Sequence, residues 1–464
     1  MLALGIGRFY VLVAALAVVL ACAAGLHEPA DAAAEQVGVT LNPTVTGPIP
    51  ADPVGSADRN YPLAAASQNL KAHHYEEQEF FFAGPAGVYK SRMVVRRPAN
   101  PKHFSGVVWV EWLNVTRGYD LDLLWSRAAE HIMKRGDAYV AVDSQATGVE
   151  GPAGLKAWSP QRYRSLSIPP SGYFVAEAGA YEIYAQALQA IRHPNGVKPL
   201  GELGVQTLIA HGYSQSAGTV SIWSNSGMAT LHGLADGFLI GGLSTSTTGG
   251  TGEASVEYPF IQSGTGVPIM LLNTETDYSF HKLWPDNDDF RLWEVAGATH
   301  IDQDSEDYLK GTYLRDFGQP EPGFECERPP IGAIPYKYVQ NDAMDALVRW
   351  IRFGTPPPSQ PGIVTDESGN IVRDAYGNAL GGVRLPEQEV PTATNSRENA
   401  GEANCSLAGS HIAFTPEQLQ QLYPTHRAYV AKVKESAEAD VGQGVLLPED
   451  AKTIIRTAKK EPIP

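Results

Sequence analysis

Cysteine is scarce in this sequence: there are only three among 464 residues, and none has a second Cys or a His at the spacing of a zinc site. Charged residues make up only 19%, and acidic side chains outnumber basic ones, which gives a formal net charge of -16. Because an acidic surface repels phosphate backbones, nucleic acid is not an expected partner. Beyond residue 24 no apolar run is long enough to span a bilayer. The abundant residues are Gly and Pro, 46 and 34 of them, which predicts many turns and long loops.

The one long apolar run lies at the N-terminus. Arg8 precedes the apolar stretch 9–24, an arrangement typical of an export signal. Two processing routes stay open: residues 19–22 (VLAC) resemble a bacterial lipobox in which Cys22 is lipidated, whereas an Ala-x-Ala site near Ala34 suits an ordinary signal peptidase. An uncleaved anchor is the remaining alternative. We predict a bacterial protein that is periplasmic, extracellular or attached to the membrane of the envelope through a lipidated N-terminus.

The other two cysteines are predicted to form a disulfide. With Cys22 inside the signal, Cys326 and Cys405 remain as an even pair in an oxidising compartment. Such a bond would staple the C-terminal region onto the main domain. Free buried thiols are the alternative.

Apolar runs and helical patterns alternate along the middle of the chain. Strands are predicted at 76–82, 88–97, 107–113, 138–142, 205–210, 237–241, 268–272 and 291–295, and helices at 120–135, 176–191, from 216, and at 338–353. This alternation predicts an α/β fold with a mostly parallel, doubly wound sheet.

Three regions are expected around this pattern. Residues 1–36 form the signal and a tether, and residues 37–358 form the α/β core. Residues 243–266 are rich in Gly, Ser and Thr and form a lid insertion or a flexible surface loop. Residues 359–464 form a C-terminal extension packed on the core, in which Asp and Gly favour a β-hairpin near 366–378 and 415–458 is helical.

A candidate nucleophile stands where a predicted strand turns into a helix. Residues 208–218 read LIAHGYSQSAG, with Ser214 at the apex. A nucleophile elbow strains the backbone at its Ser, so the residues two before and two after must be small. Gly212 and Ser216 meet this need, although Ser216 replaces the more usual Gly. The alternative is a Ser that only caps a helix.

Serine needs a general base and an orienting acid, which in this fold class follow it in the order acid, then His. His300 follows a predicted strand and a short Gly-Ala-Thr loop, which is the expected place for the base; His281 is the rival. The acid should follow the strand at 268–272. Asp277 is the preferred candidate and Glu275 the alternative, and the other of the two would act as a supporting hydrogen-bonding group.

The oxyanion hole is expected to consist of backbone donors. One is the N–H of Gln215, next to the nucleophile. The second should come from the loop after the strand at 107–113, from Asn114 or Val115. The alternative is that Asn114 only shapes the turn.

Together these residues resemble a bacterial family described as alpha/beta hydrolase domain-containing proteins. The resemblance covers most of the chain after residue 39. It rests on the segments 110–115 (VEWLNV), 212–216 (GYSQS), 273–277 (NTETD), 297–300 (GATH) and 381–386 (GGVRLP). It implies the α/β-hydrolase fold and a Ser–acid–His hydrolase, and it implies no particular substrate.

The expected activity is hydrolysis of a small-molecule carboxylic ester through an acyl-enzyme, with no metal and no organic cofactor. Three alternatives stay open. Two use the same three residues, as an amidase or peptidase or as an acyltransferase or lyase. The third is a non-catalytic envelope binding protein.

Overall fold

The computed structural model describes residues 41–170, 178–227, 233–243, 246–247, 256–257, 261, 264–278, 284–402 and 404–463. The predicted export signal with Cys22, the rival base His281 and most of the segment 243–266 lie outside these ranges. Among the helices in these ranges, none has the length and hydropathy needed to cross a bilayer.

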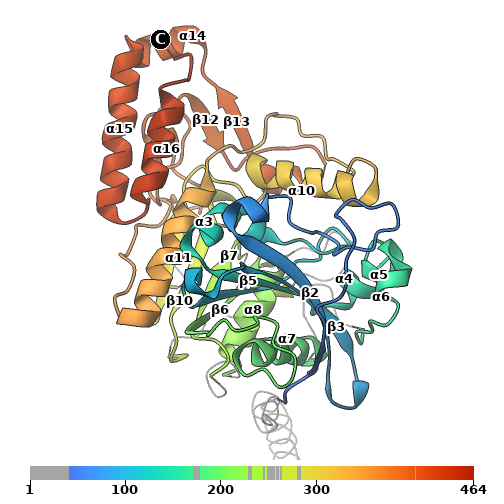
Figure 1. The fold of residues 1–464 in the computed structure, drawn as a ribbon. Coiled ribbons are helices and arrows are strands. Elements are labelled where there is room, and N and C mark those ends of the chain that lie inside the picture. Colours follow the sequence, from blue (N-terminus) through green and yellow to red (C-terminus); the bar gives the residue numbers. More distant parts are fainter. Residues whose placement is uncertain are drawn as a thin grey trace, which may run out of the picture. The chain divides into compact units, whose positions relative to one another are not determined.

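A nine-stranded sheet forms the centre of the fold (Figure 1), with the order β1-β2-β3-β5-β4-β6-β7-β10-β11. Its strands are β1 Thr44–Thr46, β2 Tyr75–Ala83, β3 Lys90–Pro98, β4 Val107–Trp112, β5 Ala138–Val142, β6 Thr207–Tyr213, β7 Gly237–Gly241, β10 Ile269–Thr274 and β11 Phe290–Val295. The first four in this order pair antiparallel, and every pairing from β5 to β11 is parallel. The predicted mostly parallel, doubly wound sheet is confirmed.

Helices cover both faces of the sheet, and its central strands β4, β5, β6 and β7 are buried along their whole length. In β4 the side chains of Val108 and Val110 join one apolar cluster, while Val107 and Trp109 join another. The first cluster includes side chains of α7 and α8, and the second includes side chains of α3 and α11 (Figure 1). The helices of the core are α3 Leu123–Arg135, α4 Ala146–Glu150, α5 Leu155–Trp158, α6 Pro160–Tyr163, α7 Ala178–Arg192, α8 Gln215–Asn225, α10 Gln303–Phe317 and α11 Tyr336–Phe353.

The C-terminal extension shares the core rather than standing apart from it. Its elements are α12 Pro386–Glu389, β12 Ala393–Ser396, α13 Cys405–Ala408, β13 Ser410–Ala413, α14 Pro416–Leu422, α15 His426–Gln443 and α16 Pro448–Ala458. Buried side chains of α15 and α16, such as Val433 and Ile454, belong to the same apolar cluster as α3 and α11. Val383 also pairs in parallel with Val295 at the end of β11.

The polar segments of the extension form two hairpin-like turns, as their Asp and Gly residues predict. Antiparallel bridges pair Thr365 with Ile371 across the first turn and Arg373 with Ala379 across the second. The segments 366–370 and 374–378 each close on themselves, with Asp366 N–H donating to the Asn370 carbonyl and Asp374 N–H to the Asn378 carbonyl. The Asp side chains accept further backbone N–H groups inside their own turns. Two successive tight turns therefore form, because each Asp satisfies its own turn.

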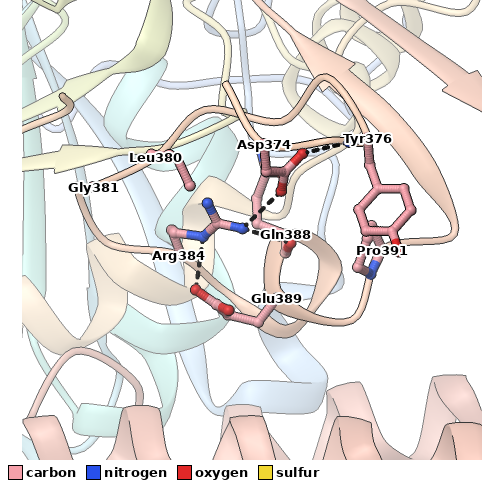
Figure 2. Close-up of a pocket in the computed structure, with 8 residues that line it drawn as sticks. All are labelled: Asp374, Tyr376, Leu380, Gly381, Arg384, Gln388, Glu389 and Pro391. Atoms are coloured by element: carbon pink, nitrogen blue, oxygen red, sulfur yellow. Dashed lines mark hydrogen bonds and ion pairs between the residues drawn. The ribbon is translucent and has the colours of Figure 1, made fainter. Parts of the chain in front are cut away.

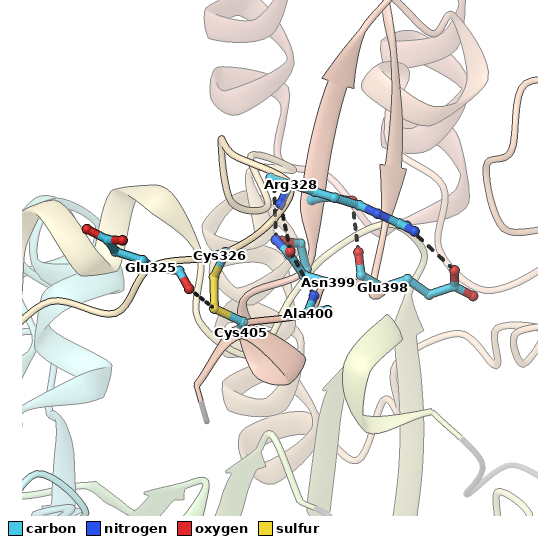
Figure 3. The surroundings of a disulfide bond; sticks show 9 residues. Glu325, Cys326, Arg328, Glu398, Asn399, Ala400 and Cys405 are labelled. Carbon is cyan, nitrogen blue, oxygen red and sulfur yellow. Dashed lines mark hydrogen bonds and ion pairs between the residues drawn. A yellow bond between two sulfur atoms is a disulfide. The ribbon is translucent and has the colours of Figure 1, made fainter. Parts of the chain in front are cut away.

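The predicted disulfide between Cys326 and Cys405 is present (Figure 3). Cys326 lies after α10, and Cys405 is the first residue of α13. Its sulfur atom also lies 3.3 Å from the Glu325 carbonyl oxygen. The bond therefore ties the extension to the segment that leaves α10.

Candidate active site

Ser214 occupies a sharp turn between β6 and α8. Its φ and ψ angles are 61° and -122°, a strained conformation for a residue with a side chain. A Cβ at Gly212 would lie 2.3 Å from the Ser216 carbonyl oxygen, so only glycine fits there. The Ser216 hydroxyl accepts from Tyr213 N–H and donates to the Tyr213 carbonyl, both at 3.0 Å. The small residues on both sides of Ser214 therefore let strand and helix approach, and Ser216 also fastens the turn.

The structure brings Ser214, His300 and Asp277 together from three separate strand ends. His300 lies on the loop after β11, and its Nε2 atom is 2.7 Å from Ser214 Oγ. Its Nδ1 atom is 2.9 Å from Oδ1 of Asp277, which follows β10. The Asp277 and His300 side chains are almost fully buried, while Ser214 is partly accessible. The three side chains form one hydrogen-bonded row.

The electrostatics of this row determine where the imidazole carries its proton. Burial by itself raises the pKa of Asp277, but the His300 imidazole and hydrogen bonds from His300 and Thr274 outweigh it, so this pKa lies below its usual value. Asp277 is therefore an ionised acceptor, and Nδ1 of His300 carries the hydrogen between them. Nε2 is left free to accept the Ser214 hydroxyl proton.

Glu275, the alternative acid, has other partners. Its Oε2 atom accepts the Gly297 N–H at 2.7 Å, and its Oε1 atom accepts Arg373 Nη2 at 2.8 Å and Arg397 N–H at 3.1 Å. Glu275 thus contacts the backbone of the loop that carries His300, whereas Asp277 contacts the imidazole itself.

The backbone N–H groups predicted to bind the oxyanion have different hydrogen-bond partners in the structure. Gln215 begins α8, where a backbone N–H has no acceptor within the helix. Val115 N–H lies 3.4 Å from Oε1 of the Gln215 side chain, a long contact beside the turn. The N–H of Asn114 donates to the Leu121 carbonyl at 3.2 Å in a β-bridge that closes the loop, so of the two predicted alternatives the N–H of Val115 stays the candidate. Asn114 instead supports the turn, since its side-chain amide donates to the Tyr213 carbonyl at 3.0 Å.

Two buried arginines brace the loop that carries Val115. Arg92 binds Asp120 at 3.1 Å and Asp143 at 2.6 Å, and Arg96 binds Asp122 at 2.7 Å. Because buried charges are costly unless they are paired, these contacts fix the aspartates that end the loop. They also explain why two arginines of strand β3 can lie buried.

Sequence reasoning missed the residues that hold the backbone of His300. The Tyr213 hydroxyl and Arg127 Nη2 donate to the His300 carbonyl at 3.0 and 3.1 Å. The Arg127 guanidinium also lies 4.2 Å from the centre of the Tyr213 ring. Tyr213 lies next to the nucleophile in the motif, but nothing in the sequence around Arg127 points to this contact.

His211, three residues before Ser214, is buried in the core of the fold. Its Nδ1 atom bonds the Leu239 carbonyl at 2.8 Å, and burial lowers its pKa to about 3. It is therefore a neutral histidine of the core.

A cavity of about 330 Å³ lies in the C-terminal extension (Figure 2). Its Arg384 guanidinium is paired with Asp374 at 3.3 Å and with Glu389 at 2.6 Å. Ser214, His300 and Asp277 are not among its lining residues. Within the described ranges, no group of three or more His, Cys, Asp or Glu side chains is arranged to hold a metal ion.

Comparison with known proteins gives one extensive match. A family model described as "Alpha/beta hydrolase domain" matches residues 45–456. No curated protein matches the sequence at a significant level.

Similar solved structures include an α/β serine hydrolase without a lid from Xanthomonas campestris, at 11% identity and a TM-score of 0.33, which covers 52% of this chain and 93% of that chain. An α/β serine hydrolase homologue from Coxiella burnetii matches at 11% identity and a TM-score of 0.30, over 52% of this chain and 96% of that chain. The esterase Est22 matches at 11% identity and a TM-score of 0.29, over 53% and 70% of the two chains.

Proposed function

The chain belongs to the alpha/beta hydrolase domain family, and on that premise we propose that it is an exported serine hydrolase that cleaves carboxylic esters. The observation that carries the proposal is the row in which Ser214 Oγ lies 2.7 Å from His300 Nε2 and His300 Nδ1 lies 2.9 Å from Asp277 Oδ1. A nucleophile, a base and an orienting acid in this geometry suit acyl transfer. The disulfide between Cys326 and Cys405 supports the export part of the proposal, since such bonds persist in oxidising compartments.

The proposed reaction has two steps. His300 Nε2 takes the hydroxyl proton as Ser214 Oγ attacks the ester carbonyl, and Asp277 stabilises the imidazolium that forms. The tetrahedral adduct then loses the alcohol, which receives the proton from His300, and an acyl-enzyme remains. Water repeats the sequence, with His300 as base and then as acid, and releases the carboxylic acid and the free Ser214.

The developing oxyanion needs donors that are already in place. We assign this role to the N–H of Gln215 and the N–H of Val115, because the N–H of Asn114 is engaged by Leu121. The Gln215 side chain is held away from solvent by its amide, which donates to Gln145 Oε1 at 2.8 Å. Its own Oε1 lies opposite the Val115 N–H at 3.4 Å, so an incoming oxyanion competes with a weak contact.

A fluorophosphonate probe tests the proposal, because it labels only an activated serine. We expect the mature protein to be labelled at Ser214 and the Ser214→Ala variant to remain unlabelled. Ser221→Ala is a matched control, because its buried hydroxyl donates to the Gly218 carbonyl within α8 and its loss should leave labelling in place. Absence of labelling in the folded wild-type protein would refute the proposal.

A panel of esters with acyl chains of different length, run beside the corresponding amides, tests the reaction class. We expect turnover of esters to exceed that of amides. Amide turnover at comparable rates would replace the esterase assignment with an amidase, and transfer of the acyl group to an added alcohol in preference to water would indicate an acyltransferase.

A further inference from the structure

The loop that carries His300 is held by two different parts of the chain. On the core side, Tyr213 and Arg127 donate to the His300 carbonyl, and His300 N–H lies 3.3 Å from the Thr276 hydroxyl. These contacts restrain one edge of the loop. Two further backbone N–H groups of the loop bind the C-terminal extension.

Backbone hydrogen bonds connect the extension to this loop on both sides of His300. Ala296 N–H donates to the Val383 carbonyl at 3.0 Å, and Ile301 N–H donates to the Leu407 carbonyl at 3.0 Å. Leu407 lies in α13, which begins at the disulfide-bonded Cys405. The extension thus binds the loop four residues before His300 and again directly after it.

Glu275 is the third connection, and it joins three segments at one side chain. It is fully buried and follows β10, two residues before the acid of the row. One carboxylate oxygen binds the Gly297 N–H of the His300 loop. The other binds Arg373 and the Arg397 N–H, both in the extension. Glu275 N–H in turn donates to the Ala298 carbonyl at 2.9 Å.

A buried carboxylate of this kind depends on its charge partner. Removing one member of a buried ion pair leaves the other charge without compensation, and the surrounding structure rearranges. Without Arg373, the negative charge of Glu275 would have only backbone donors, and the loop that it holds would lose its fixed position.

We propose that Glu275 and Arg373 are positioning residues for His300, which makes the C-terminal extension a working part of the active site. This inference rests on the proposed function. Glu275 does not touch the imidazole; it fixes the backbone three residues before it, and so sets the approach of His300 Nε2 to Ser214 Oγ. A displacement of about 1 Å between reacting groups can cost about 100-fold in rate.

Kinetics of matched variants test the inference. Arg373→Ala and Glu275→Gln should lower kcat by about 10- to 100-fold and leave KM within about threefold, because the geometry of reaction changes and the substrate contacts do not. Arg373→Lys keeps the charge and should recover most of the loss. Arg135→Ala is the control: Arg135 also joins core and extension, by pairing with Asp345 and Glu449, but it does not contact the His300 loop. Equal losses in the control and in Arg373→Ala would reduce Arg373 to general stability and overturn the inference.

A second readout does not depend on turnover. The proton between His300 Nδ1 and Asp277 should give a low-field ¹H NMR signal, assigned by its loss in Asp277→Ala. We expect this signal to broaden or disappear in Arg373→Ala and Glu275→Gln and to persist in Arg135→Ala. An unchanged signal in both positioning variants would overturn the inference, whereas a wild-type protein with this signal but without fluorophosphonate labelling would count against the proposed function alone. If Arg373→Ala does not fold, Glu275→Gln and Arg373→Lys decide by the same signal.

Discussion

Replacing Asp277 by Asn is the most informative change in the candidate active site, because it removes one charge and almost no volume. Oδ2 of Asp277 accepts the Thr274 hydroxyl at 2.7 Å, while Oδ1 faces His300 Nδ1. In the Asp277→Asn variant, the side-chain carbonyl oxygen is expected to take the place of Oδ2, because it can accept the Thr274 hydroxyl. The amide NH2 then faces His300 Nδ1, which must become an acceptor, so the ring proton moves to Nε2 and the imidazole can no longer accept from Ser214.

The size of the effect follows from the geometry. A charge pair separated by the observed 2.9 Å between His300 Nδ1 and Asp277 Oδ1 is worth about 6 kcal/mol at an effective dielectric constant of about 20. Because about 1.4 kcal/mol changes a rate tenfold, loss of this stabilisation corresponds to roughly a 10⁴-fold fall in kcat. Glu275→Gln leaves the imidazole and Asp277 in place. Its fall in kcat should therefore be at least about 100 times smaller than that of Asp277→Asn.

The assay is ester turnover by the two variants and the wild type at neutral pH, with thermal unfolding as a check that each protein is folded. We expect the large loss in Asp277→Asn and the smaller one in Glu275→Gln. A larger loss in Glu275→Gln would transfer the acid role to Glu275. If both variants keep full activity, neither carboxylate orients the base and the reasoning fails.

Three further changes test the fold around the site. Burial raises the pKa of Glu111 to about 8, so its carboxylate destabilises the folded state increasingly as the pH rises from about 4.5 to 8. Glu111→Gln should remove about 4 kcal/mol of that pH dependence, measured by denaturant unfolding at pH 5 and pH 8. An unchanged dependence of stability on pH would contradict this. Replacing both Cys326 and Cys405 by Ser opens a loop with a sequence separation of 79 residues, and should lower the free energy of unfolding by about 4 kcal/mol; wild-type stability in the variant would show that the bond constrains little. Gly212→Ala places a Cβ 2.3 Å from the Ser216 carbonyl oxygen and should abolish fluorophosphonate labelling; retained labelling with unchanged thermal stability would refute the steric argument.

Local patterns were sufficient to predict the elements that position the site. The strands before Ser214, Asp277 and His300 are largely buried on both faces, so their sequences are mostly apolar, and the polar residues that follow them mark the strand ends. The need for small residues around Ser214 is also local, since the turn brings Gly212 against Ser216. Each of these features involves residues close together in the chain, so it can be recognised from the sequence alone.

The sequence by itself therefore determined the doubly wound sheet, the elbow at Ser214 and the candidates for its partners, because each depends on short-range periodicity or on side-chain size. Only the tertiary structure decided that Asp277 rather than Glu275 meets the imidazole, that the Asn114 N–H is used by Leu121, and that Arg127, Arg373 and Leu407 hold the His300 loop. These contacts join residues far apart in the chain, and their energies depend on burial and on charge partners that exist only once the sheet and the extension have packed together.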